Sequence, residues 1–313
     1  MTSFTDEEED QTEAGRLGMA WLLDTALKNA GAVFDDGPSA WTSHVVVDRN
    51  LITGQNPGSS EATADAVINL VGILQGKRGV PYGPQFAKAH VELPNKIVAA
   101  CQAKVVRRLI HMSAIGADSN GPSMYLRSKG DGEKAVRESN LATTIFRPSV
   151  VFGPEDNFLN QFAFLERIFP VIPLACSQAK IQPIFVGDVA KALANVLDLD
   201  AASGRVYELA GPTVYTLEEL VRFSGAAIGK HARIIRLPDS LGRLQAMSLE
   251  LAPGEPMMSR DNLDSMKTPA VASGPMAPEL GIEPASIEAI APMYLTGSST
   301  RSRFNTFRAS AGR

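Results

Sequence analysis

The chain has 313 residues, of which 44% are hydrophobic and 20% charged, with a formal net charge of −4. This composition is ordinary for a globular protein with a core, and it argues against nucleic acid as a partner, because phosphate binding requires a dense basic surface. Its two cysteines and four histidines are too scattered to form a metal-binding motif. We therefore expect no metal and, without a membrane-spanning run or an export signal, a cytoplasmic location.

Residues 1–65 are predicted to form a helix followed by a β-hairpin. Apolar residues recur at helical spacing over residues 14–30. Two apolar runs, Val45–Val47 and Leu51–Thr53, then flank the polar residues 48–50, a pattern typical of a hairpin.

This first segment resembles a known family. The run AWTSHVVVDRNLITGQNPGSSEATADAV, residues 40–67, is similar to the last strands and terminal helix of the PfpI-type, class I glutamine-amidotransferase-like family. The chemistry of that family depends on a cysteine that precedes this tail. Residues 1–40 contain no cysteine, so we expect no hydrolase or glyoxalase activity.

From Ala66 onward the chain alternates strand and helix patterns. The run AVINLVGIL at residues 66–74 is apolar almost throughout, as expected for a strand that is covered on both faces of a parallel sheet. The further predicted elements are a helix at 85–103, a strand at 105–112, a helix at 123–139, a strand at 142–147, a helix at 157–169, strands at 181–186 and 206–209, a helix from a capping box at Thr216 and Glu219, a strand at 233–237 and a helix after Pro238.

This order predicts an α/β fold with a Rossmann-type, doubly wound parallel sheet over residues 66–295. Its C-terminal part would form a subdomain for a substrate or a partner. Residues 296–313, which are rich in arginine and serine, are predicted to form a tail.

Three residues of the second segment can carry chemistry. Tyr125 and Lys129 are four apart on a predicted helix and therefore share a face. An ammonium beside a phenol favours the phenolate, so we expect Lys129 to lower the pKa of Tyr125 and allow proton transfer to or from a substrate oxygen. Ser113 follows a strand at the rim where doubly wound sheets bind ligands, and its hydroxyl could hold the same oxygen.

Together with flanking motifs, these residues resemble the later landmarks of extended short-chain dehydrogenases. The landmarks occur in order: NLVG after the first strand, Ser113, the Tyr-x-x-x-Lys pair, and FRPSVVFGP from Phe146. The resemblance implies catalytic roles for Ser113, Tyr125 and Lys129. It implies cofactor contacts by Asn69, Leu70, Val71, Gly72, Tyr125, Lys129, Pro148, Ser149, Val150 and Val151.

A narrower resemblance covers residues 66 to about 295. The runs YLRSKGDGEKAV, FGPEDNFLNQFA and QPIFVGDVAKAL are similar to those of the NAD(P)H-binding accessory subunit of respiratory complex I and its bacterial relatives. In that family the nucleotide is generally held for structure, without established turnover. The resemblance thus implies a nucleotide cofactor, with respiratory-complex subunits or a membrane surface as partners, and a position peripheral to the inner face of the respiratory membrane.

The phosphate-binding turn of such proteins is not found in residues 1–68. A complete protein of this type begins with a strand, a Gly-x-x-Gly-x-x-Gly turn and a helix whose N-terminus holds the pyrophosphate. We expect the first three strand–helix units to be missing, with a seam near residues 62–68. NAD(P)H binding would then be weak or absent, and the open edge of strand 66–74 could promote self-association.

Three functional interpretations follow. The first is a non-catalytic NAD(P)H-binding protein of the accessory-subunit type. The second is an NAD(P)-dependent oxidoreductase or epimerase that uses Tyr125 and Lys129. The third is a recombined chimera without an evolved function.

Overall fold

A computed structural model of the chain describes residues 45–48, 51–54, 66–104, 106, 108–197, 199–251 and 256–296. The helix predicted at residues 14–30 and the tail beyond Thr296 lie outside the described residues. The chain divides into two compact units, Met1–Val67 with Cys101–Arg107, and Ile68–Ala100 with Arg108–Arg313.

In the first unit, the predicted hairpin is confirmed. Strands β1 (Val45–Asp48) and β2 (Leu51–Gly54) pair antiparallel, with Val45 opposite Gly54 and Asp48 opposite Leu51. The predicted turn comprised residues 48–50, whereas Asp48 is the last residue of β1 and pairs with Leu51.

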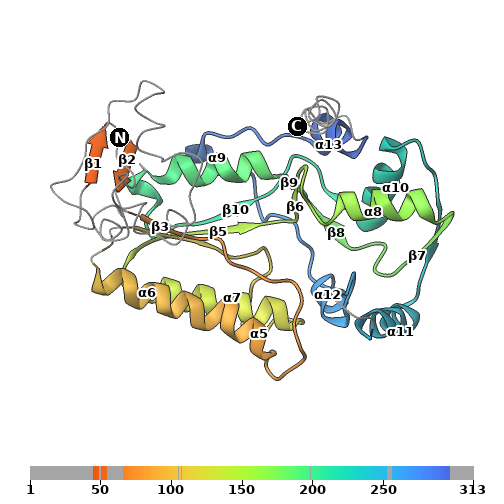
Figure 1. Cartoon of the computed structure of the whole chain (residues 1–313), viewed down its shortest axis with the longest axis horizontal. Helices are drawn as coiled ribbons and strands as arrows, with labels where there is room; N and C mark the ends of the chain where they lie inside the picture. The colour runs from red at the N-terminus through yellow and green to blue at the C-terminus, as the bar shows by residue number, and fades with distance from the viewer. Residues whose placement is uncertain are drawn as a thin grey trace, which may run out of the picture. The chain divides into compact units, whose positions relative to one another are not determined.

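The second unit is built on a sheet with the strand order β10-β5-β4-β3. The strands are β3 (Ala66–Asn69), whose last two residues belong to this unit, β4 (Arg108–Met112), β5 (Ala142–Pro148) and β10 (Val206–Leu209). Strand β5 pairs in parallel with both β4 and β10 (Figure 1). The predicted α/β class with a parallel sheet is thereby confirmed, and β3 lies at an edge of the sheet among the described strands.

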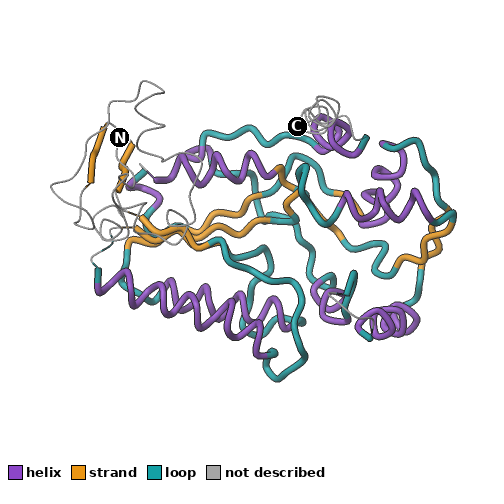
Figure 2. The backbone as a smooth tube through the Cα atoms, viewed as in Figure 1, coloured by secondary structure: helices purple, strands orange, loops and turns teal. Residues whose placement is uncertain are grey.

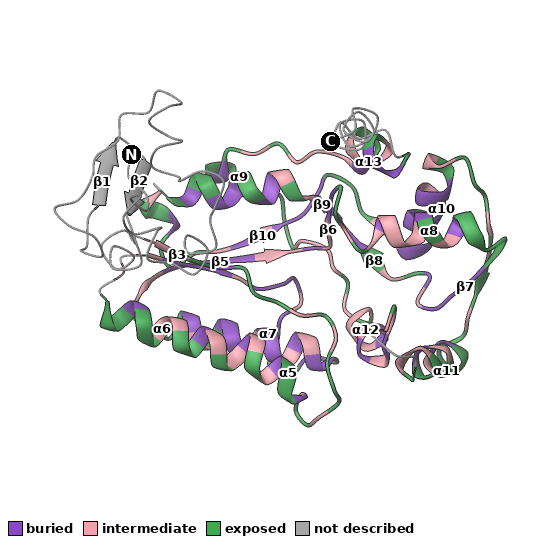
Figure 3. Cartoon of the chain, in the orientation of Figure 1, coloured by how far each residue is buried: buried purple, intermediate pink, exposed green. Residues whose placement is uncertain are grey.

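Helices cover both faces of this sheet (Figure 2). Helix α9 (Val186–Leu197) packs on one face through a core that includes Ile110, Phe146 and Val196. The other face carries a continuous helical run of α5 (Pro84–Phe86), the π-helix η2 (Ala87–Glu92) and α6 (Leu93–Ala103), together with α7 (Met124–Arg137). Buried and exposed residues recur at helical spacing along α9, as expected for a helix that lies with one face on a sheet, whereas most residues of α7 are buried or half-buried (Figure 3).

The C-terminal half of this unit has its own core, formed by residues such as Phe152, Leu159, Leu220 and Ile287. Its helices are α8 (Leu159–Ile168), α10 (Leu217–Ala227), α11 (Asp239–Glu250), α12 (Arg260–Ser265) and α13 (Ile287–Leu295), with short 3-10 turns η3 (Asp200–Ala202) and η4 (Pro278–Leu280). Its strand pairs are β6 (Val151–Phe152) with β9 (Ile184–Phe185), β7 (Val171–Leu174) with β12 (Arg233–Arg236), and β8 (Lys180–Ile181) with β11 (Tyr215–Thr216).

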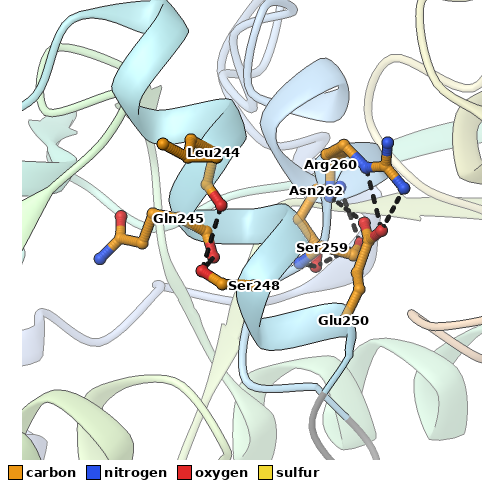
Figure 4. Close-up of polar contacts among 7 residues, drawn as sticks. All are labelled: Leu244, Gln245, Ser248, Glu250, Ser259, Arg260 and Asn262. Atoms are coloured by element: carbon orange, nitrogen blue, oxygen red, sulfur yellow. Dashed lines mark hydrogen bonds and ion pairs between the residues drawn. The ribbon is translucent and has the colours of Figure 1, made fainter.

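Hydrogen bonds at the ends of several of these helices fix where the helices begin or how they are joined. The predicted capping box of α10 is confirmed, since Thr216 and Glu219 each bind the backbone N–H of the other. Between α11 and α12, the Glu250 carboxylate accepts hydrogen bonds from the backbone N–H and the guanidinium of Arg260 (Figure 4).

Two predicted strands differ in the structure. The strand predicted at residues 66–74 ends at Asn69, because the Asn69 side chain accepts a hydrogen bond from the N–H of Val71 and turns the chain out of the sheet. The strand predicted at 181–186 is split at Gln182, whose backbone N–H bonds instead to the carbonyl oxygen of Ala270. Among the described residues, no helix is long and apolar enough to cross a membrane.

Candidate functional site

The predicted site residues lie where β3, β4 and β5 end. Ser113 directly follows β4, and Tyr125 and Lys129 lie in the first turns of α7. This helix begins where its sequence predicts, because the Ser123 hydroxyl accepts the N–H of Leu126 at 3.0 Å. The Asp261 carboxylate on α12 accepts the next two free N–H groups, those of Met124 and Tyr125.

Lys129 lies at the centre of the site. Its side chain is 4% exposed, and Nζ donates to the carbonyl oxygen of Met112 at 2.6 Å. A Cβ atom placed on Gly72 would lie 3.8 Å from Nζ, so the loop after β3 passes directly beside the ammonium. Burial lowers the pKa of Lys129 to about 8, partly opposed by the charge of Glu133, and the side chain therefore stays mainly cationic at neutral pH.

Tyr125 is not activated in the way that the sequence predicted. Burial raises the pKa of Tyr125 to about 12, and the Lys129 ammonium does not lower it. The pKa of Tyr125 is thus shifted in the direction opposite to the one expected from Lys129, whose Nζ donates to the Met112 carbonyl oxygen. The Tyr125 ring instead packs edge-on against His90, with centroids 5.6 Å apart. A protonated phenol can donate a hydrogen bond but does not act as a base.

Ser113 is fully engaged by its neighbours. It is 2% exposed, and its Oγ donates to Glu133 Oε2 at 2.7 Å. The Arg147 guanidinium binds both oxygens of the same carboxylate, through Nε at 2.8 Å and Nη2 at 2.7 Å, and these hydrogen bonds raise the pKa of Arg147. The hydrogen of the Ser113 hydroxyl is thus directed to Glu133 and away from any substrate oxygen.

The loop after β3, from Asn69 to Ile73, is held by hydrogen bonds on its inner side. Asn69, which is 2% exposed, accepts from the Val71 N–H with Oδ1 and bonds to His111 Nδ1 through Nδ2 at 3.1 Å. Leu70 and Val71 point outward, with exposed fractions of 57% and 47%. The structure therefore brings residues 69–72 together with Lys129.

The fourth predicted landmark, at the end of β5, is held by contacts with residues other than Lys129. The carbonyl oxygen of Pro148 accepts the N–H of Ile115, and the Ser149 hydroxyl donates to the Ala270 carbonyl oxygen at 2.6 Å. Val150 and Val151 form backbone contacts with the strand that contains Ile184. Among the described residues, no hydrogen bond or ion pair joins this segment to the Lys129 side chain.

Sequence reasoning missed Glu133 and His90. Glu133 lies four residues after Lys129 on the same helix face, so its spacing was a usable signal. His90 accepts a hydrogen bond from the Ile73 N–H at 3.0 Å, and no feature of its sequence context predicts this contact. Beside the site, a cavity of about 500 Å³ is lined by Arg78, Gly79, Val80, Pro122, Met124, Arg127, Asp261 and Asp264. Over the described part of the chain, no cluster of side chains could hold a metal ion.

Known proteins resemble this chain in sequence. A family described as the RmlD substrate binding domain matches residues 87–224. The NADH-ubiquinone oxidoreductase 40 kDa subunit of Neurospora crassa is 32% identical over 254 residues, which cover 80% of this chain and 66% of that protein. The mitochondrial NADH dehydrogenase [ubiquinone] 1 alpha subcomplex subunit 9 of Rattus norvegicus is 33% identical, over 72% of this chain and 59% of its own length. The chain thus spans less than two thirds of either relative.

Solved structures are similar in fold. A dTDP-glucose 4,6-dehydratase from Streptomyces venezuelae with NAD bound has a TM-score of 0.57 and 16% identity, over 76% of this chain and 74% of that structure. The fold is therefore that of Rossmann-type NAD-binding epimerases and dehydratases, and the homologues are subunits of respiratory complex I. Both findings confirm the resemblances predicted for the second segment. The resemblance of the first 65 residues and the missing first units stay predictions.

Proposed function

We propose that the chain binds NAD(P)H weakly and holds it without turnover, as a peripheral subunit of a respiratory NADH dehydrogenase. Its homology to complex I subunits supports the partnership. The hydrogen bond from Ser113 to Glu133 supports binding without turnover, because it uses the hydroxyl hydrogen that would otherwise hold a substrate oxygen. The raised pKa of Tyr125 also supports binding without turnover, since the phenol is a poor base at neutral pH.

The groups at the site fit the nicotinamide side of a dinucleotide. The Lys129 ammonium can donate to ribose hydroxyls, and the backbone of Asn69–Gly72 can approach the nucleotide because Gly72 has no side chain. We assign Pro148–Val151 to the same binding surface. We expect a low affinity, because residues 1–68 contain no Gly-x-x-Gly-x-x-Gly turn for the pyrophosphate.

The partners are the nucleotide and other subunits of a respiratory complex, at the inner face of the respiratory membrane. We also propose that copies of the chain can associate through β3, because a strand at the edge of a sheet presents unpaired backbone groups.

Thermal unfolding with and without millimolar NADH or NADPH tests the proposal. A nucleotide that binds only the folded state raises the melting temperature by an amount that grows with the logarithm of one plus the ratio of its concentration to its dissociation constant. We expect a shift of a few degrees and no oxidation of either nucleotide. A dissociation constant in the low micromolar range would contradict weak binding, and an unshifted or non-cooperative transition would favour the chimera without a function.

The second candidate is an NAD(P)-dependent oxidoreductase or epimerase. The four-residue spacing of Tyr125 and Lys129 on α7 favours it. Turnover of a carbonyl or sugar substrate that is lost in Tyr125→Phe, with the melting temperature unchanged, would establish this alternative.

A further inference from the structure

His90 links the loop after β3 to helix α7. It lies in the π-helix η2, is 2% exposed, and accepts the backbone N–H of Ile73 with Nε2 at 3.0 Å. Its Nδ1 is 2.8 Å from the Ser128 hydroxyl, and that hydroxyl donates to the Tyr125 carbonyl oxygen at 2.9 Å. Because the Ser128 hydroxyl donates its hydrogen to Tyr125, Nδ1 of His90 must carry a proton and donate it to Ser128. Nε2 is then unprotonated and can accept the Ile73 N–H.

The neutral form of His90 is stabilised by its surroundings. Burial and the nearby Lys129 ammonium lower the pKa of His90 to about 3. The titratable groups that face it are Lys129 and Tyr125 on α7 and His111 on β4. The acceptor for the Ile73 N–H is therefore present throughout the physiological pH range.

The contact fixes the second end of a short loop. Asn69 holds the N–H of Val71 at the first end, and His90 holds the N–H of Ile73 at the second. Gly72 lies between these two anchors, and a Cβ atom on it would be 3.8 Å from both His90 Nε2 and Lys129 Nζ. The inner side of the loop is thus bonded, while Leu70 and Leu74 leave its outer side exposed.

We propose that His90 is a positioning residue, which holds the Asn69–Ile73 loop against Lys129 so that the Gly72 backbone is preorganised for the nucleotide. This inference rests on the proposed nucleotide binding and names a residue that controls its affinity. A loop that is already ordered loses less conformational entropy when a ligand binds, so the affinity depends on the anchor. The role requires the acceptor at the Nε2 position and does not require the donor at Nδ1.

Two substitutions separate these atoms. In His90→Gln the amide can place an oxygen near the Nε2 position, which keeps an acceptor for Ile73. In His90→Asn the shorter amide reaches only the Nδ1 position, so it keeps a donor to Ser128 and loses the anchor. Both variants replace a buried ring by a smaller amide, so each is the matched control for the other.

The experiment measures two properties of the full chain and its variants. The first is hydrogen exchange of the Ile73 amide without nucleotide, and the second is the dissociation constant for NADH and for NADPH. In His90→Asn we expect faster exchange at Ile73 and about tenfold weaker nucleotide binding, the effect of one lost hydrogen bond. In His90→Gln both values should stay close to those of the unaltered chain.

Two outcomes would overturn the inference: equal losses of affinity in the two variants, or Ile73 exchange that neither substitution changes. Equal losses that follow the melting temperature would identify His90 as a packing residue alone. If the unaltered chain binds neither nucleotide, the proposed function fails, and the exchange comparison still decides whether His90 holds the loop.

Discussion

At the scale of single residues, Glu133 connects helix α7 to Ser113 after β4 and to Arg147 on β5. Its side chain is 3% exposed and accepts hydrogen bonds from Ser113 and Arg147. The Glu133→Gln substitution keeps the shape and removes the charge. It should lower the free energy of unfolding by about 3 kcal/mol, because the Arg147 charge loses its partner in a partly buried position.

Chemical denaturation of the two proteins measures this loss. Arg137 provides the control, since it also faces Glu133, at 3.6 Å, but is 58% exposed. Arg137→Ala should cost less than about 1 kcal/mol. Similar losses for the two variants would mean that the Glu133–Arg147 pair is no stronger than an exposed ion pair.

The two buried histidines make the stability depend on pH. Burial, together with Lys129, lowers the pKa of His90 and of His111 to about 3 from an unfolded value of 6.5. Below pH 6.5 the unfolded chain binds protons that the folded chain does not. The contribution of the two histidines to stability is therefore fully present above pH 6.5 and is lost as the pH falls from 6.5 towards 3, by up to about 1.4 kcal/mol per pH unit for each histidine.

Denaturation between pH 7 and pH 5, compared between the unaltered chain and a histidine variant, measures this effect. His90→Gln should reduce the slope by the contribution of one histidine. An equal slope in the unaltered chain and His90→Gln would show that His90 is not held neutral.

At the scale of elements, the packing of α7 on η2 depends on a helical glycine. A methyl group on Gly132 would overlap the carbonyl oxygen of His90. In an isolated helix, replacing glycine by alanine stabilises by about 1 kcal/mol. Here Gly132→Ala should instead destabilise the chain by about 1 to 3 kcal/mol, because α7 must move away from η2.

The melting temperature measures this effect, with Gly274→Ala as the control. A methyl group at Gly274 would meet no atom within 4 Å, so that variant should be as stable as the unaltered chain. Stabilisation in Gly132→Ala would mean that the two helices are not in close contact.

Elements with local signals could be predicted from the sequence. The capping box of α10 needs only Thr216 and Glu219, three residues apart, and β10 was predicted with its observed bounds. The end of β3 and the break at Gln182 could not be predicted in this way. The first depends on how a single side chain, Asn69, bonds, and the second on Ala270, which lies far away in the sequence.

For the site, too, some features could be predicted from local sequence and others depend on distant residues. The shared face of Tyr125 and Lys129 follows from helix periodicity, and the structure has both on α7. The charge effect between them depends on where Nζ points, which the Met112 carbonyl oxygen decides. The roles of Ser113 and His90 likewise depend on partners from other elements, Glu133 and the Ile73 backbone. Periodicity gives the position of a residue, and tertiary hydrogen bonds then decide what its polar atoms can do.

At the scale of the whole molecule, the boundary predicted near residue 65 implies that the chain from residue 66 onward folds without the first 65 residues. The hydrogen bonds described for the site join residues between Asn69 and Ala270. The core clusters described around Ile110 and around Phe152 consist of residues from Ile110 onward, and buried core residues that precede them, such as Phe86, also lie after residue 65. A chain that begins at residue 66 should therefore fold cooperatively and keep the nucleotide-dependent shift in melting temperature, because it retains every contact described for the site.

Calorimetry of this shortened chain, beside the full chain with and without NADPH, tests the claim. A matched variant that begins at residue 74 removes β3 and the loop up to Ile73, which together hold the Asn69 and Ile73 contacts. It should lose the nucleotide response even if it still melts cooperatively. Aggregation of the chain that begins at residue 66 would show that the first 65 residues are required for folding. Residues 1–65 would then be an essential part of this molecule, and the boundary predicted from the change in sequence character would not be a boundary between independent domains.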